Sequence, residues 1–321
     1  MKKFIEQANR FGKNRTPFFF MLDFEKERPV IHELGACREN GIFYNIEGET
    51  NVDLDLLPIP NVEFQANPIS FEEYQESFDS VMKAIHYGDS YLTNLCFPTL
   101  IESNLTLRDV FRFSKAKYKL LIDQQFMVFS PEPFIKIENG KISTYPMKGT
   151  IDARIEDAER KILTNEKEIA EHATIVDLLR NDLNIIANNV RVEKYRYVEE
   201  VESWSHRLLQ VSSQIVGDLP ENCQDHLGEY VDLLTPAGSI SGAPKKRTVE
   251  LIRSAERQNR GYFTGVFGIY DGEILNSGVM IRFIELTKNG LQFWSGGGLT
   301  SRSKAIEEYQ EMIQKVYVPI Y

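Results

Sequence analysis

A lysine, Lys148, stands in the segment YPMKGTIDAR (145–154), between an X-Pro pair and a Gly-Thr pair. Pro146 favours extended backbone at the residue before it, and Gly149 permits a positive φ or the close approach of another group. A strand that ends in such a corner would present the Lys148 amine at the rim of a sheet. A lone loop lysine is more often a solvated surface residue, so its role depends on what the rest of the chain brings near it.

Carboxylates recur at helical spacing in two expected helices. Glu171 lies near the edge of the apolar stripe of a helix that begins at Asn165. In the last expected helix, Glu308, Glu311 and Lys315 follow an i, i+3, i+7 pattern and therefore share one face. Each set can be an exposed group of ion pairs. Carboxylates that converge from two helices would equally suit Mg²⁺, which prefers oxygen ligands.

Two glycine-rich segments and one arginine could bind an anion. The segments are PAGSISGAPK (236–245) and WSGGGLTS (294–301), and neither is a mononucleotide P-loop, because Ala243 replaces the second glycine of that motif. Backbone amides of such loops cradle anions, including carboxylates, although tight turns explain the glycines as well. Arg282 interrupts the apolar strand pattern GVMIRFIEL (278–286). A guanidinium there pairs with a buried carboxylate of the protein or holds one that belongs to a ligand.

Composition limits the classes of function. The 321 residues are 42% apolar and carry a net charge of −10, without the clustered Lys and Arg that nucleic-acid binding needs. Cys37, Cys96 and Cys223 are widely spaced and form no C-x-x-C pair, so neither a disulfide framework nor a zinc site is indicated. The N-terminal segment does not resemble a signal peptide, and its run PFFFMLDF is too short to span a bilayer. We expect a cytoplasmic protein that binds no membrane.

Turn and cap signals predict the elements that must position these residues. Asn-Gly or Asp-Gly pairs predict β-hairpins at 139–140, 271–272 and 289–290. Capping residues predict helices that begin after Ser70, after Asn165 and at Pro244, and a last helix covers about 304–317. The buried stripe of the second helix should include Ile169, Ala173, Val176, Leu179, Leu183 and Ile186. The sum predicts an α/β protein of the α+β type, in which residues 1–65 are a β-rich lead-in to the same compact unit.

Nine segments occur in an order that is typical of one family. They are GDSYLTNL, FSPEPFI, PMKGT, EIAEHATIVDLLRNDL, GSISGAPK, RGYFTGVFGIYDG, IRF, SGGGLTS and EEYQEMIQK. Together, over about residues 70–321, they resemble the chorismate-utilising enzymes, which include the anthranilate, isochorismate, salicylate and aminodeoxychorismate synthases. The resemblance implies an antiparallel β-sandwich core with helices packed outside, chorismate as substrate and Mg²⁺ as cofactor. Residues 66–321 would then be the chorismate-binding catalytic domain.

The resemblance also assigns expected roles to single residues. Glu171 and Glu311 match the metal-binding glutamates of the family, with Glu308 beside them. Glu132 matches the general acid near the leaving group. The residues that would hold the carboxylates of the substrate or line its site are Arg282, Tyr262, Thr150, Gly242, Gly297, Gly298 and Lys315.

Three positions bear on the branch of the family. Anthranilate synthases have alanine where this chain has Lys148, whereas aminodeoxychorismate synthases that use a covalent intermediate have lysine. Leu92 stands where isochorismate and salicylate synthases have a lysine base, and Gln210 replaces a histidine tied to pyruvate elimination. The resemblance therefore implies aminodeoxychorismate synthase component I, which converts chorismate and ammonia to 4-amino-4-deoxychorismate. A glutamine amidotransferase subunit would supply the ammonia, and Glu132 would protonate the leaving hydroxyl. Lys148, desolvated and beside Mg²⁺, would attack as a partly neutral amine.

Two alternatives stay open at this stage. The chain could be an anthranilate synthase component I, or a catalytically impaired member of the family that regulates a glutaminase. The retained glutamates and arginine argue against the impaired member. The L-L-E-S motif of the tryptophan site of relatives is absent from the sequence, so we expect no tryptophan binding.

Overall fold

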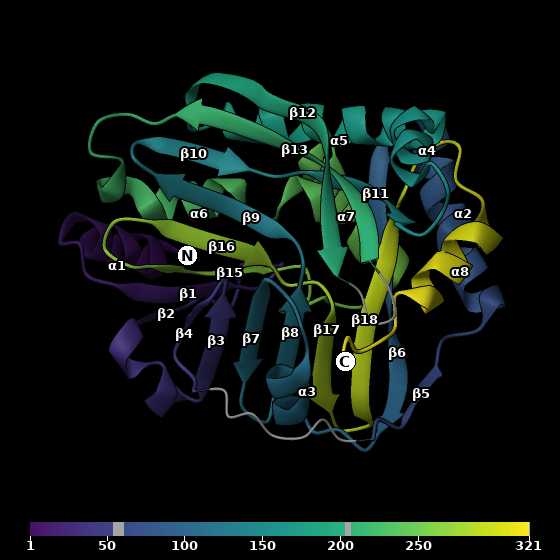
Figure 1. Ribbon diagram of the computed structural model, residues 1–321, viewed down its shortest axis with the longest axis horizontal. Coiled ribbons are helices and arrows are strands. Elements are labelled where there is room, and N and C mark those ends of the chain that lie inside the picture. The colour runs from purple at the N-terminus through teal and green to yellow at the C-terminus, as the bar shows by residue number, and fades with distance from the viewer. Residues whose placement is uncertain (54–60, 203–206, 321) are drawn as a thin grey trace.

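The computed structural model describes residues 1–53, 61–202 and 207–320. Within these ranges, nine strands form each of two sheets, and every strand pairing is antiparallel. Most strands of the first sheet run across the view of Figure 1, whereas most of those of the second run up and down it. The predicted α+β class with antiparallel sheets is confirmed.

The first sheet has the order β11-β13-β10-β9-β16-β15-β1-β2, with β12 also paired to β13. Its strands are β1 (Phe18–Leu22), β2 (Val30–Glu33), β9 (Pro133–Glu138), β10 (Lys141–Thr144), β11 (Met147–Asp152), β12 (Asn188–Glu202), β13 (Arg207–Asp218), β15 (Val266–Tyr270) and β16 (Leu275–Val279).

The second sheet has the order β14-β6-β18-β17-β8-β7-β3-β4, with β5 also paired to β6. Its strands are β3 (Ile42–Ile46), β4 (Glu49–Thr50), β5 (Phe64–Asn67), β6 (Leu92–Ser103), β7 (Tyr118–Ile122), β8 (Phe126–Ser130), β14 (Gly242–Ala243), β17 (Phe283–Thr287) and β18 (Gly290–Leu299).

The core lies in layers. Aromatic side chains of both sheets meet between them, with Phe19 and Phe267 from the first and Phe283 and Trp294 from the second. Helices cover the outer faces: α1, α5 and α6 pack on the first sheet, and α2, α3 and α8 on the second. The helices are α1 (Lys2–Lys13), α2 (Phe71–Tyr87), α3 (Leu107–Phe113), α4 (Ala158–Thr164), α5 (Glu166–Leu183), α6 (Leu227–Leu234), α7 (Lys245–Glu256) and α8 (Ala305–Gln314).

Local turn chemistry explains the hairpins, and all three are confirmed. Asn139 and Gly140 both have positive φ, of 53° and 72°, in the turn that joins β9 to β10. Gly272 and Gly290 have φ of 108° and 110° in the turns between β15 and β16 and between β17 and β18. Glycine adopts such angles without the penalty that a Cβ atom brings.

Side-chain caps begin the two helices where the sequence predicts them. The Ser70 hydroxyl accepts a hydrogen bond from the Glu73 amide (3.2 Å), and the Asn165 side chain accepts one from the Glu168 amide (3.1 Å). The expected buried stripe of α5 is partly wrong, because Ala173 is exposed. The side chains that α5 buries are His172, Ile175, Val176, Leu179, Asp182 and Leu183.

Helix α1 was not among the expected elements. It lacks a side-chain N-cap and an acidic first turn, so the usual start signals are missing from the sequence. None of the described helices is long and apolar enough to cross a membrane.

Candidate active site

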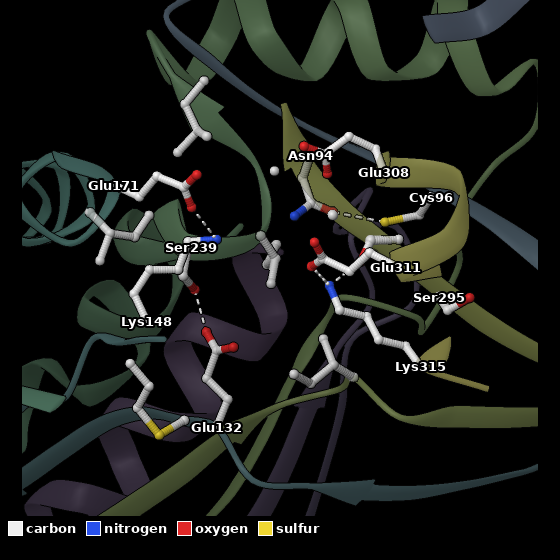
Figure 2. Close-up of a pocket in the computed structure, with 18 of the residues that line it drawn as sticks. Asn94, Cys96, Glu132, Lys148, Glu171, Ser239, Ser295, Glu308, Glu311 and Lys315 are labelled. Carbon is white, nitrogen blue, oxygen red and sulfur yellow. Dashed lines mark hydrogen bonds and ion pairs between the residues drawn. The ribbon is translucent and has the colours of Figure 1, made fainter. Parts of the chain in front are cut away.

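A cavity of about 580 Å³ lies between the two carboxylate-bearing helices, α5 and α8, and the strands β11 and β18. Figure 2 shows Glu171, Lys148, Ser239 and Glu132 on one side, facing Glu308, Glu311 and Lys315 on the other. Most of the site residues expected from the sequence line this cavity. The residues that do so are Glu132, Lys148, Thr150, Glu171, Arg282, Gly297, Gly298, Glu308, Glu311 and Lys315.

Lys148 extends from β11 into the cavity. The register of β11 against β13 shifts between Met147 and Thr150, and Gly149 has a φ of 89° there, with a side-chain oxygen of Glu168 3.1 Å from where its Cβ atom would lie. Glycine therefore lets the strand deform against α5. The Lys148 amine lies 2.9 Å from Oε2 of Glu171. The segment 145–154 therefore places the Lys148 cation beside carboxylates.

The carboxylates beside Lys148 affect the pKa of its amine. Burial acts to lower the pKa of the Lys148 amine, but the carboxylates of Glu171, Glu311 and Glu168 outweigh it and hold the pKa above its usual value. These carboxylates favour the cationic form, whereas the partly neutral amine that we expect is one that also lies beside Mg²⁺. The cationic amine must lose a proton before it can act as a nucleophile.

Glu132 lies between β8 and β9, on the same side of the cavity as Lys148. Burial raises the pKa of Glu132, against the opposing effects of a hydrogen bond from Ser239 and the charges of Lys148 and Lys315. A raised pKa keeps a proton on the carboxyl group closer to neutral pH. Glu132 is therefore suited to donate a proton to a leaving group.

Helix α8 presents Glu308 and Glu311 to the cavity, and Lys315 follows at its end. The Lys315 amine lies 2.7 Å from Glu311 Oε1 and donates a 2.8 Å hydrogen bond to the Gly296 carbonyl. A Cβ atom on Gly297 would lie 3.3 Å from Glu308 Oε2, so a glycine there leaves room for the carboxylate beside β18. The pKa of Glu311 is lowered because Lys315 outweighs burial, whereas burial raises the pKa of Glu308.

Arg282 supplies a buried cation to the cavity. Its guanidinium donates to the Lys315 carbonyl (2.8 Å) and lies 5.1 Å from the centre of the Tyr317 ring. In the part of the chain that the structure describes, Arg282 forms no ion pair, and burial lowers its pKa. A guanidinium that faces a cavity in this way favours an anionic ligand.

Two expected residues do not line the cavity. The Tyr262 hydroxyl donates to the Arg28 carbonyl (3.0 Å) and its ring lies under the Arg28 guanidinium, whereas the next residue, Phe263, lines the cavity. Gly242 is in β14, paired with Thr93, where an added Cβ atom would lie 1.8 Å from the Leu92 carbonyl oxygen. Gly242 therefore permits close strand pairing.

A buried ion pair outside the cavity holds two segments of its lining together. Arg260 and Glu256 are 1% and 0% exposed at their side chains, with 2.5 Å between them. Arg260 also donates to the carbonyls of Asn94 (2.8 Å) and Ile240 (3.0 Å), which are both cavity-lining residues. One guanidinium thus joins two segments of the lining.

The carboxylates of Glu171, Glu308 and Glu311 are candidate magnesium ligands. Glu311 and Glu171 both contribute to raising the pKa of Glu308, so the three share one region of negative potential, and all their donor atoms are oxygens. Among the described residues, no three His, Cys, Asp or Glu side chains are gathered closely enough to form a ready metal centre. Glu171 and Glu311 instead bind lysines. The donor set fits Mg²⁺ in its chemistry, provided that the ion displaces these amines.

Sequence analysis missed several lining residues. Glu168 lies one helical turn before Glu171 and lines the cavity. Its position in the first turn of α5, where its amide donates to the Asn165 side chain, already accounts for it in the sequence. Ser239 and Asn94 also line it, and neither carries a signal in a single sequence that separates it from an ordinary loop or strand residue.

Comparisons with known proteins show the family of the chain. Residues 58–320 match the model of the family described as chorismate binding enzyme. An uncharacterized PabA-like protein of Haemophilus influenzae is 49% identical over 100% of this chain and 97% of its own length. Aminodeoxychorismate synthase component 1 of Klebsiella aerogenes is 32% identical over 77% of this chain and 57% of its own length. The crystal structure of anthranilate synthase component I from Streptococcus pneumoniae superposes with a TM-score of 0.64 at 27% identity, covering 82% of this chain and 60% of that one.

Proposed function

The chain belongs to the family of chorismate-binding enzymes, and we propose that it acts as aminodeoxychorismate synthase component I. In this role it converts chorismate and ammonia to 4-amino-4-deoxychorismate, a precursor of para-aminobenzoate and folate. The observation that carries the proposal is the Lys148 amine in the cavity, on the same side as a carboxyl group that can hold a proton. A nucleophile and an acid are the two groups that displacement of a ring hydroxyl requires.

Binding of the substrate would depend on fixed cations and backbone amides. Chorismate has two carboxylates, and Arg282 and Lys315 offer positive charge inside the cavity. Gly297 and Gly298 leave the β18 backbone accessible beside them. These groups would orient the ring and exclude water from it.

The chemical step would begin with proton transfer from Lys148. Its amine lies 2.9 Å from Glu171 Oε2 before Mg²⁺ binds, and an ion on that carboxylate would lower the pKa of the amine, so that the proton is lost to solvent. The neutral amine then bonds to C2 of the ring while the C4–O bond breaks, and Glu132 protonates the departing hydroxyl, which leaves as water. Ammonia next bonds to C4, the C2–N bond breaks, and Lys148 recovers its proton. Two allylic displacements place nitrogen at C4.

Glu171, Glu308 and Glu311 are the residues that would hold Mg²⁺. A bound Mg²⁺ would supply positive charge that neutralises these carboxylates and one carboxylate of the substrate, and so would lower the pKa of the neighbouring Lys148 amine. The partner in this proposal is a glutamine amidotransferase that releases ammonia.

Product analysis tests the function. The chain with chorismate, Mg²⁺ and ammonium should form 4-amino-4-deoxychorismate, and glutamine should replace ammonium only when an amidotransferase is added. Formation of 2-amino products would instead indicate the anthranilate reaction. No consumption of chorismate would indicate a catalytically impaired member of the family.

A covalent adduct tests the role of Lys148. Chorismate and Mg²⁺ without ammonia should leave a mass increase on the peptide that contains residue 148, because a bound amine reacts at an effective concentration of about 10⁵ M or more. Lys148→Ala should abolish the adduct and shift residual product toward the 2-amino isomer. Lys167→Ala, which removes a more distant amine on the same cavity, should retain it. Normal 4-amino product from Lys148→Ala, with no adduct in the parent, would refute this role.

A further inference from the structure

One side chain contacts Glu132 within the cavity, and the reaction described above does not use it. The Ser239 hydroxyl donates a hydrogen bond to Oε1 of Glu132, with 2.5 Å between the oxygens. Figure 2 shows this bond as the dashed line at Glu132, whose second carboxyl oxygen carries none. Within the described residues, Oε2 has no hydrogen-bond partner from the protein and remains available to a ligand.

The loop that carries Ser239 is fixed on both sides. Ser239 is the middle residue of the short 3₁₀ helix η4 (Gly238–Ile240). A Cβ atom on Gly238 would lie 2.7 Å from a carboxylate oxygen of Asp182, so the loop packs directly on α5 at that residue. Arg260 holds the Ile240 carbonyl, and the Ser241 hydroxyl donates to Ala237 (2.8 Å). The hydroxyl of Ser239 therefore has a position set by the fold, as preorganised groups in active sites require.

A second, small cavity explains why Glu132 needs this restraint. It has a volume of about 20 Å³, which is room for one water molecule, and both Glu132 and Ser239 line it. Asp182 and Thr144 also line it. Without a bond to Oε1, the Glu132 carboxyl group could turn toward this space and away from the substrate.

We propose that Ser239 is a positioning residue for Glu132: its hydroxyl occupies Oε1, so that the transferable proton resides on Oε2, which faces the substrate. The inference rests on the proposed role of Glu132 as an acid and adds a residue to it. The serine does not contact the breaking bond in this scheme. It selects the orientation and the oxygen from which the proton leaves.

The surroundings of Glu132 give the direction of the pH effect. Lys148 lies on the same side of the main cavity, Lys315 lies on the opposite side, Asp182 lines the small cavity, and Ser239 donates to Glu132. Burial raises the pKa of Glu132, and the Ser239 hydrogen bond lowers it because that bond stabilises the charged form. Loss of the hydroxyl should therefore raise the pKa further. An acid must be protonated, so the alkaline limb of the rate profile should move to higher pH.

The test compares Ser239→Ala with two matched variants. Ser239→Thr keeps a hydroxyl at the same position, and Thr174→Ala removes a hydroxyl that lines the same cavity but donates to the Ala170 carbonyl (2.9 Å) and not to Glu132. Infrared difference spectra recorded through a pH titration report the protonated carboxyl band of Glu132, which Glu132→Gln identifies by its absence. This measurement needs neither substrate nor turnover. Chorismate consumption against pH provides the second measurement.

Ser239→Ala should raise the pKa of Glu132 by about one to two pH units, the shift expected for loss of a hydrogen bond to a charged group. It should also lower kcat by roughly tenfold while KM changes little, because an acid contributes to the transition state and not to binding. Ser239→Thr should restore both values, and Thr174→Ala should leave the titration of Glu132 unchanged. A Glu132 band that titrates alike in wild type and Ser239→Ala, or that moves equally in Thr174→Ala, would overturn the proposal. A band that moves in a protein that does not consume chorismate would support the positioning and refute the proposed function.

Discussion

Lys148 and a divalent cation would compete for the same carboxylate, so removal of Lys148 should strengthen metal binding. The amine lies 2.9 Å from Glu171 Oε2, and the two side chains are 33% and 18% exposed. A pair at about 4 Å contributes about 1 kcal/mol in water and about 4 kcal/mol at an effective dielectric constant of about 20. Partial exposure places this pair toward the lower value. We expect Lys148→Ala to bind a divalent ion about tenfold more tightly, which corresponds to about 1.4 kcal/mol.

Binding of Mn²⁺, followed by electron paramagnetic resonance in the absence of substrate, measures this change, and Mg²⁺ is measured by competition. Lys167→Ala is the matched control. Its amine lies 3.8 Å from the other Glu171 oxygen and is 59% exposed, so its removal should change the affinity by about twofold or less. Equal or weaker binding in Lys148→Ala would refute Glu171 as a metal ligand. A larger gain in Lys167→Ala would refute the competition between the ion and Lys148.

Four further outcomes follow. Glu171→Gln and Glu311→Gln should each reduce Mg²⁺-dependent chorismate consumption roughly 100-fold or more, since a metal contributes several kcal/mol to such steps; unaltered dependence on Mg²⁺ would contradict the assignment. Wild-type kcat/KM should fall as pH rises through the raised pKa of Glu132, and Glu132→Gln should have a low kcat/KM that shows no such fall. Glu256→Gln should lower the free energy of unfolding in urea by about 3 kcal/mol, because it leaves a buried guanidinium unpaired, whereas Glu76→Gln, from an exposed pair, should cost less than about 1 kcal/mol. Tryptophan should give no heat of binding by calorimetry, since the L-L-E-S motif is absent.

The parts of the fold that depend on neighbouring residues were predictable from the sequence. Asn-Gly and Asp-Gly pairs define hairpin turns by their own φ angles, and Ser70 and Asn165 begin helices with their own side chains. The strand register of these hairpins follows from the turns.

Features that depend on distant partners were not predictable. Helix α5 buries His172 and Asp182 because Ser213 lies 2.7 Å from the imidazole and Lys245 lies 3.0 Å from the carboxylate, and both partners come from elsewhere in the chain. The apolar stripe alone therefore wrongly predicts that Ala173 is buried. The cationic state of Lys148 likewise depends on carboxylates from two helices.

The candidate site was predictable in its types of residue but not in every position. Tyr262 and Gly242, which the resemblance assigns to the substrate site, do not line the cavity. Tyr262 precedes β15 in a turn, where no alternation tells which of two neighbouring aromatic residues faces inward. Ser239 has no distinguishing pattern, because a hydroxyl in a glycine-rich loop becomes informative only when its partner, Glu132, is known.

Helix α8 comes after every strand of both sheets in the chain, and this order has a consequence for how the site is completed. A protein is synthesised from its N-terminus, so the sheets can form before Glu308 and Glu311 arrive opposite Glu171. The helix is held by buried Met312 and by the Tyr309 hydroxyl, which donates to the Ile69 carbonyl (2.7 Å), against repulsion between like charges. Its local opening should therefore cost less free energy than opening of the strands. Any ligand that neutralises these carboxylates would stabilise α8 in its packed position. Slower amide hydrogen exchange in α8 would then report that the cavity is filled.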